Sequence, residues 1–133
     1  MKYNLFIGRY QSPHKGHMFI FNEYLIANKP ILIAIRDISP DENNPLSAFD
    51  VKELWETVYE ANDLVKVIVI PDIESVNYGR GVGYSINEIM VDTQIANISA
   101  TEIRIQIMEG KHDWKKYVDE KIHTLLESKI IGK

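Results

Sequence analysis

The residues of this sequence that are best suited to chemistry lie in one short stretch near the N-terminus. The stretch 8–21 reads GRYQSPHKGHMFIF and places His14 and His17 three residues apart, with a glycine directly before the second histidine. If a helix begins here, its first N–H groups and its partial positive charge attract anions. Imidazoles donate hydrogen bonds to phosphate oxygens, Arg9 adds a fixed charge, and Gly16 lets a ligand approach the backbone closely. The pattern indicates a phosphate-binding corner.

Two other interpretations of the histidine pair stay open at this point. Zinc needs three or four protein ligands, but His112 and His123 are distant in sequence and no carboxylate lies at a familiar offset. We therefore expect no metal site built by the protein itself. The pair could also be ordinary surface histidines at the start of a helix. Other phosphate motifs are missing, since the chain has no G-x-x-x-x-G-K-[ST], and the glycine cluster 79–83 does not follow the first strand.

The elements that must position this corner alternate between strands and helices. Continuous apolar runs are typical of strands, and apolar residues at helical spacing predict helices. In chain order we expect a strand at 3–7, a helix at 16–27, a strand at 31–35, a helix that begins at Ser47 with Asp50 in a capping box, and a strand at 64–70.

This β-α-β-α-β order predicts a parallel sheet with right-handed crossovers. Because the strand runs are apolar throughout, we expect strands buried on both faces, in one compact α/β domain over residues 1–133 with a Rossmann-like, doubly wound sheet. Such sheets bind ligands at the carboxyl ends of their strands. The histidine corner follows the first strand and therefore lies at that edge.

The second half of the chain is less regular. We expect a glycine-containing loop at 74–84, and residues 86–91 suit either a short strand or a helical turn. Ser99 and Glu102 form a capping-box pattern, which predicts a helix at 100–109 that ends at Gly110. A last helix is expected at 119–129. Trp55 and Trp114 lie at helical positions and are more typical of a core than of a base-stacking surface.

Composition limits the classes of function. The chain has 133 residues and a net charge of −4, which disfavours general nucleic-acid binding. It has no cysteine, which fits a reducing compartment, and no apolar run long enough to span a membrane. We expect a cytoplasmic protein, complete from Met1, with no nucleic-acid or membrane partner.

Two motifs resemble one family. GRYQSPHKGH is similar to the G-x-[FY]-x-P-x-H-x-G-H signature of the nucleotidyltransferase superfamily that shares the "HIGH" element with class I aminoacyl-tRNA synthetases. ISATEIR, at 98–104, resembles its second signature, I-S-x-T-x-x-R. The segments NPLS at 44–47 and VIPDI at 69–73 further resemble archaeal-type nicotinamide mononucleotide (NMN) adenylyltransferases, and the similarity covers most of residues 3–122.

The chain also departs from these enzymes. Asp50 and Val51 stand where they usually carry a Glu-Arg pair, and the section 71–97 before the second signature is shorter than theirs. That section contains their acceptor-contacting residues, so the match is closer for the nucleotide than for the acceptor.

The resemblance implies an adenylyltransferase that uses ATP and a phosphorylated acceptor, with NMN as the best candidate and NAD and pyrophosphate as products. It implies catalytic roles for His14, His17 and Arg104, and nucleotide binding by Gly8, Arg9, Tyr10, Lys15, Gly16, Ser99 and Thr101. Tyr78, Arg80 and Tyr84 are candidates for acceptor or base contacts. Mg²⁺ is expected with the triphosphate, and a homo-oligomer is expected from the relatives. The alternatives are a cytidylyltransferase for a small phosphorylated alcohol and a non-catalytic nucleotide-binding module.

Overall fold

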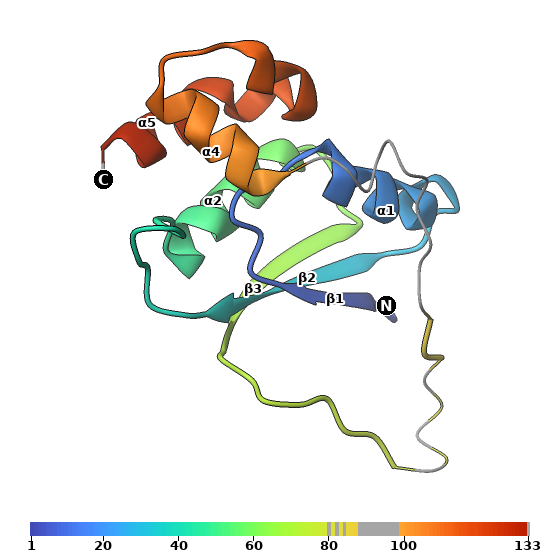
Figure 1. Cartoon of the computed structure of the whole chain (residues 1–133). Coiled ribbons are helices and arrows are strands. Elements are labelled where there is room, and N and C mark those ends of the chain that lie inside the picture. Colours follow the sequence, from blue (N-terminus) through green and yellow to red (C-terminus); the bar gives the residue numbers. More distant parts are fainter. Residues whose placement is uncertain (80, 82, 84, 88–98, 133) are drawn as a thin grey trace.

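The fold is taken from a computed structural model, which describes residues 1–79, 81, 83, 85–87 and 99–132 (Figure 1). The elements in chain order are β1 (Asn4–Gly8), α1 (Lys15–Ile26), β2 (Ile31–Asp37), α2 (Ala48–Val58), β3 (Val65–Pro71), α4 (Ala100–Met108), the 3-10 helices η1 (Asp113–Tyr117) and η2 (Glu120–Ile122), and α5 (His123–Ile131). The predicted β-α-β-α-β order is confirmed.

The three strands form one parallel sheet in the order β1-β2-β3. Phe6 pairs with Ile33 and Ile33 pairs with Val67, so the strands lie in register across the sheet. Parallel pairing brings the carboxyl ends of β1 and β2 to the same edge. The loops that follow these strands therefore meet there, and they carry the histidine corner and the Asp37–Leu46 segment.

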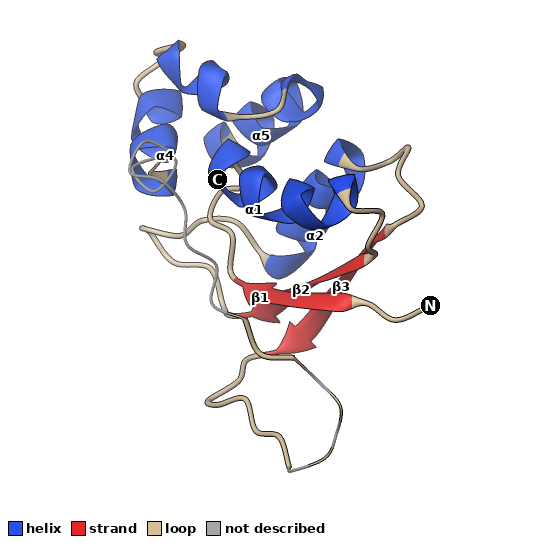
Figure 2. Ribbon diagram, turned by 90° about the vertical axis from the view of Figure 1, so that its right-hand side faces the viewer, coloured by secondary structure: helices blue, strands red, loops and turns tan. Residues whose placement is uncertain are grey.

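The helices of the described part of the chain lie on one side of the sheet, as both views show (Figures 1 and 2). The middle strand is buried, with Ile33, Ala34 and Ile35 almost without solvent contact. Leu5 of β1, however, is 55% exposed. The expectation of strands buried on both faces is therefore correct for most of β2 and wrong for β1 and β3, since Lys66 of β3 is also exposed. An apolar run does not reveal what covers each face of a strand. The structure is α/β with a parallel sheet, and its described residues do not place helices on both faces.

The core lies between the sheet and α2, and the C-terminal helices extend it. The apolar stripe of α2 is fully buried, including Leu54 and Trp55, and α4 and α5 contribute Ile103 and Leu126. Trp114 is also fully buried, and its indole N–H donates to the Lys111 carbonyl at 3.0 Å. Each such side chain contributes about 1.5–3 kcal/mol by burial. Both tryptophans are core residues, as predicted.

The helix ends follow the local sequence closely. Ser47 and Asp50 form the predicted capping box at the start of α2. Ser99 caps α4 by accepting the Glu102 N–H, although the reciprocal Glu102 bond is not formed. Gly110 has φ +74° just after α4, where glycine is favoured.

The second half differs from expectation at its C-terminal end. The last helix starts at His123, because a short 3-10 helix precedes it, and η1 was not predicted. The described residues of the 74–84 segment form no helix or strand, as expected. Residues 88–91, which contain most of the ambiguous strand or turn, lie outside the described residues.

Candidate functional site

The two histidines form a capping box made of imidazoles at the start of α1. Nδ1 of His14 accepts the Gly16 N–H at 3.0 Å, and Nδ1 of His17 accepts the His14 N–H at 3.2 Å. The rings stack with their centroids 3.8 Å apart. Since each Nδ1 accepts a hydrogen bond, a neutral ring carries its proton on Nε2. The cap therefore leaves one Nε2–H donor on each imidazole.

Burial keeps both imidazoles neutral. It lowers the pKa of His14 to about 4, and burial together with the neighbouring His14 lowers the pKa of His17 to about 3. At neutral pH the pair consists of uncharged donors and not of imidazolium ions. The expected free N–H at Gly16 is already used by His14, so the side chains, more than that backbone group, are available to a ligand.

Aromatic rings pack against the histidine pair. Tyr10 and Trp55 contact the His17 ring edge-on, with centroid distances of 4.9 and 5.8 Å. Tyr10 has φ +54°, and this turn folds its ring back over Gly8. A Cβ at Gly8 would lie 2.8 Å from Tyr10 Cζ. The packing of Tyr10 thus favours glycine at position 8, and the partly buried Tyr10 ring packs against His17.

Gln11, which sequence reasoning did not select, fastens this loop to the start of α2. Its Nε2 donates to the Leu46 carbonyl at 2.7 Å, and its Oε1 accepts the Leu46 N–H at 3.1 Å. Gln11, Ser12 and His14 are all buried. The position of the histidines therefore depends on a segment 35 residues further along the chain. No local pattern marks this pairing.

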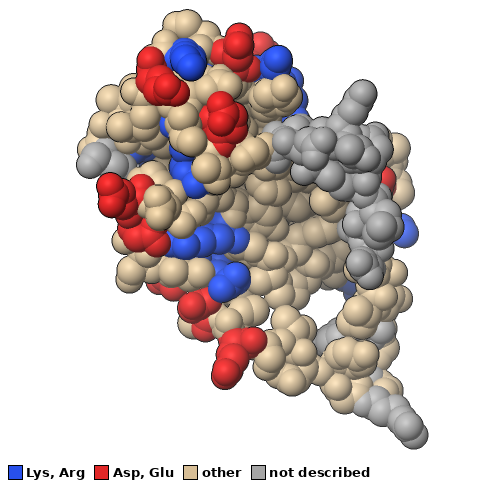
Figure 3. Space-filling view, in the orientation of Figure 1, with Lys and Arg blue, Asp and Glu red and all other residues tan. Residues whose placement is uncertain are grey.

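Arg9 and Arg104 bring the two sequence motifs together. Arg104 folds back toward the start of α4, and its Nη2 donates to Thr101 Oγ1 at 3.3 Å. Arg9 donates to the Ser39 carbonyl at 3.2 Å. Burial and then the positive charge of Arg9 lower the pKa of Arg104, so a charge from the first motif acts on a residue of the second. Figure 3 shows Lys and Arg side chains, with Asp and Glu side chains near them, beside a surface of uncharged residues.

Two polar atoms of the corner are buried and have no hydrogen-bond partner among the described residues: Arg9 Nε and Ser12 Oγ. Such atoms are costly unless water or a ligand satisfies them. Ser12 also marks a departure from the first signature. The signature places proline at this position, and here the proline comes one residue later, as Pro13.

Asp41 is a second residue that sequence reasoning missed. Its Oδ1 accepts the N–H groups of Asn43 and Asn44 at 2.9 and 2.8 Å, and its Oδ2 lies 4.0 Å from Arg9. The Asn44 bond is the largest cause that lowers the pKa of the Asp41 carboxyl. The run DENN at 41–44 is typical of such a side-chain-to-backbone turn and could have indicated it. A carboxylate thus lies beside Arg9.

The structure does not bring the remaining predicted residues into contact with the histidine pair. Lys15 is exposed at the start of α1, and Ser99 Oγ is used as the cap of α4. Tyr78 is 63% exposed on a segment that extends away from the helices in Figure 1, so the structure does not bring it to the corner. Arg80 and Tyr84 lie outside the described residues.

Other features of the described chain do not add to this site. An open hollow of about 650 Å³ lies near the carboxyl end of β3, lined by Phe49, Lys52 and Ile70 among others, but by none of the predicted site residues. The residues that the structure describes contain no group of three metal-ligating side chains. None of their helices has the length and apolar character needed to cross a membrane.

Comparison with known proteins does not identify the chain. It matches no protein-family model, and the comparison with curated proteins also found no match.

Proposed function

We propose that this protein is a nucleotidyltransferase that transfers an adenylyl group from ATP to a phosphorylated acceptor, with NMN as the best candidate. The main support is the stacked pair His14 and His17, whose capping bonds leave a neutral Nε2–H donor on each ring at the carboxyl edge of a parallel sheet, where Rossmann-like folds bind nucleotides. Arg9 belongs to the loop that leads to these histidines and adds a fixed positive charge. The charge of Arg9 also acts on Arg104 of the second motif.

The proposed reaction is a displacement at phosphorus. A phosphate oxygen of the acceptor attacks the α-phosphorus of ATP, a new P–O bond forms, and the bond to the β-phosphate oxygen breaks to release pyrophosphate. The nucleophile is already an anion, so no strong general base is needed. Catalysis then rests on positioning and on stabilising negative charge.

The electrostatics of the corner suit this chemistry. Histidines with pKa values of about 4 and 3 are poor proton acceptors at neutral pH, but their Nε2–H groups can donate to phosphate oxygens. We assign these donors to the α-phosphate. Arg104 is assigned to the leaving pyrophosphate, because a planar guanidinium binds two phosphate oxygens at once.

In this proposal Mg²⁺ binds together with the triphosphate. The described residues offer one carboxylate beside Arg9, that of Asp41, and no set of three ligands. Mg²⁺ commonly binds through substrate phosphates and water with one or two carboxylates, and this arrangement is compatible with the corner.

The test is an incubation with each of the four nucleoside triphosphates, Mg²⁺ and a panel of phosphorylated acceptors, scored by pyrophosphate release. We expect release with ATP that requires an acceptor, and NMN as the preferred acceptor. His17→Ala should lower turnover on the order of 100-fold or more, as removal of one transition-state donor does. His112→Ala is the matched control, because His112 is exposed and its side chain caps no helix.

The other outcomes of this assay are equally specific. Preference for CTP would assign the chain to the cytidylyltransferases that act on small phosphorylated alcohols. Triphosphate binding in calorimetry without pyrophosphate release would identify a nucleotide-binding module. The expected homo-oligomer is tested separately by light scattering of the same preparation.

A further inference from the structure

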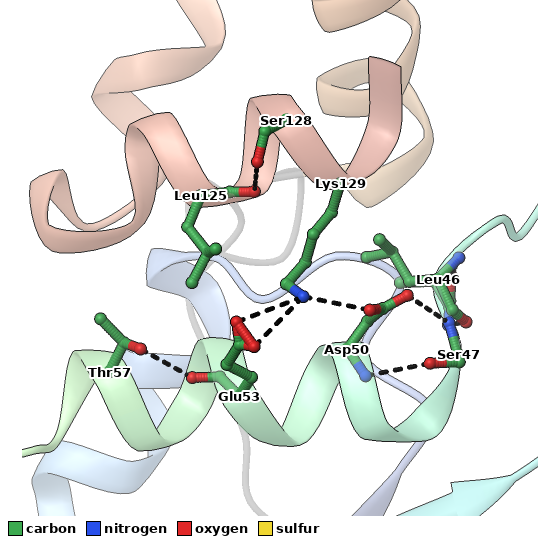
Figure 4. Close-up of polar contacts among 9 residues, drawn as sticks. Leu46, Ser47, Asp50, Glu53, Thr57, Leu125, Ser128 and Lys129 are labelled. Carbon is green, nitrogen blue, oxygen red and sulfur yellow. Dashed lines mark hydrogen bonds and ion pairs between the residues drawn. The ribbon is translucent and has the colours of Figure 1, made fainter. Parts of the chain in front are cut away.

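Lys129, near the end of α5, makes a partly buried polar contact between the C-terminal helix and α2. Its Nζ lies 3.0 Å from Asp50 Oδ1 and 3.4 Å from a carboxylate oxygen of Glu53, and its side chain is 15% exposed (Figure 4). Asp50 is 79 residues distant in sequence. Burial alone would lower the pKa of Lys129, but the Asp50 and Glu53 carboxylates outweigh burial and raise it. Lys129 is therefore charged and joins α5 to α2 by ion pairs.

Asp50 also hydrogen-bonds to Ser47 at the start of α2. Its Oδ2 accepts the Ser47 N–H at 3.1 Å, while its own N–H donates to Ser47 Oγ at 3.0 Å. One carboxylate thus contacts both Lys129 and Ser47, the N-cap of α2, as Figure 4 shows. Loss of the ammonium would remove a positive charge that lies 3.0 Å from the mostly buried Asp50 carboxylate, which favours movement of Asp50 toward solvent.

The next residue toward the N-terminus completes the connection. Leu46 directly precedes Ser47, is fully buried, and exchanges two hydrogen bonds with the Gln11 side chain. Gln11 begins a run of four buried residues that ends at His14, the cap of α1. A continuous series of short contacts therefore joins Lys129 to the imidazole pair.

We propose that Lys129 is a positioning residue for the histidine corner, acting through Asp50, Ser47, Leu46 and Gln11. It touches none of the imidazoles itself. Its role is to keep the start of α2 in the place from which Gln11 holds the loop before His14. Its effect on turnover rests on the proposed function, whereas its effect on the geometry of the imidazoles does not.

The experiment compares Lys129→Met, which removes the charge with little change in volume, with Lys129→Arg, which can restore both carboxylate contacts. Lys52→Met is the matched control, because Lys52 lies on α2, pairs with Glu56 at 3.0 Å and is outside the series of contacts. The readouts are the ¹³C and ¹⁵N ring signals of His14 and His17 in nuclear magnetic resonance spectra, turnover by pyrophosphate release, and thermal melting.

We expect Lys129→Met to shift the ring signals of both histidines, to lower kcat about 10-fold through misplaced donors, and to change KM for the triphosphate much less. Lys129→Arg should restore signals and turnover, and Lys52→Met should change neither. Combining Lys129→Met with Gln11→Ala should shift the rings no further than Gln11→Ala alone, because both changes interrupt one series of contacts.

Unchanged ring signals in folded Lys129→Met, or equal shifts in Lys52→Met, would overturn the proposal. If Lys129→Met does not fold, Lys129→Gln, which keeps a neutral donor, takes its place with the same two criteria. If the wild-type protein shows no turnover with any triphosphate, the proposed function fails, but the ring signals still decide whether Lys129 positions the histidines.

Discussion

The buried histidine pair makes the stability of this protein depend on pH in a direction that the structure determines. His14 and His17 have pKa values of about 4 and 3 in the folded chain, below the usual 6.5, because of burial. The unfolded chain therefore binds protons more readily than the folded chain. This contribution to stability is present above pH 6.5 and is lost as the pH falls from the unfolded value toward the folded ones.

The magnitude follows from proton linkage. A histidine that stays neutral in the folded chain but is protonated in the unfolded chain lowers the free energy of unfolding by about 1.4 kcal/mol for each unit that the pH falls. From about pH 7 to about pH 5, each therefore contributes a loss of about 2 kcal/mol, and the pair about 4 kcal/mol. The result depends little on the folded values, since both lie below this window. Ordinary carboxylates titrate mainly below it.

The assay is urea unfolding at both pH values for the wild type and for a double variant. His14→Asn keeps an acceptor at a favoured cap residue, and His17→Gln keeps one at the third helix position. The double variant should lose most of the pH dependence while it remains folded. The assigned burial of the imidazoles would be refuted if the free energy of unfolding of the wild type fell by less than about 1 kcal/mol between the two pH values. It would also be refuted if the double variant lost as much stability as the wild type.

Three further predictions concern the residues around this pair. Arg104→Lys should cut turnover at least 10-fold while the melting temperature changes little, because the lost bidentate phosphate contact matters more than an exchange of one cation for another; kinetics and melts on one preparation measure both. Gly8→Ala should destabilise by about 1–3 kcal/mol, since the added Cβ meets the Tyr10 ring at 2.8 Å, whereas Gly79→Ala has open space and should be neutral in the same urea titration. Ser99→Ala should cost about 1 kcal/mol through loss of the α4 cap; an affinity for ATP that drops far more than stability would instead indicate direct phosphate binding.

Local sequence patterns were sufficient for the three strands and for α1, α2 and α4, but not for the two 3-10 helices or the start of α5. The strand and helix bounds follow from apolar runs and helical spacing, and the caps at Ser47 and Ser99 follow from side chains three residues from their partners. Such bonds form within one turn, so their signal is local. The placement of the histidine corner at the carboxyl edge followed from the alternation of strands and helices.

The burial of the strand faces was harder to predict. An apolar run reports that a strand is hydrophobic, but not whether a helix covers each of its faces. Leu5 therefore appeared buried from its neighbours in the sequence and is exposed at the edge of the described sheet.

The arrangement that makes the corner a candidate site was decided by tertiary structure. Gln11 meets Leu46, Lys129 meets Asp50, and the charge of Arg9 acts on the pKa of Arg104. The histidines were visible in the sequence, but their neutral state was not, because it results from the rings packed around them. Contacts between distant segments leave no periodic trace in a single sequence, since they depend on how whole elements pack and on how much water that packing removes.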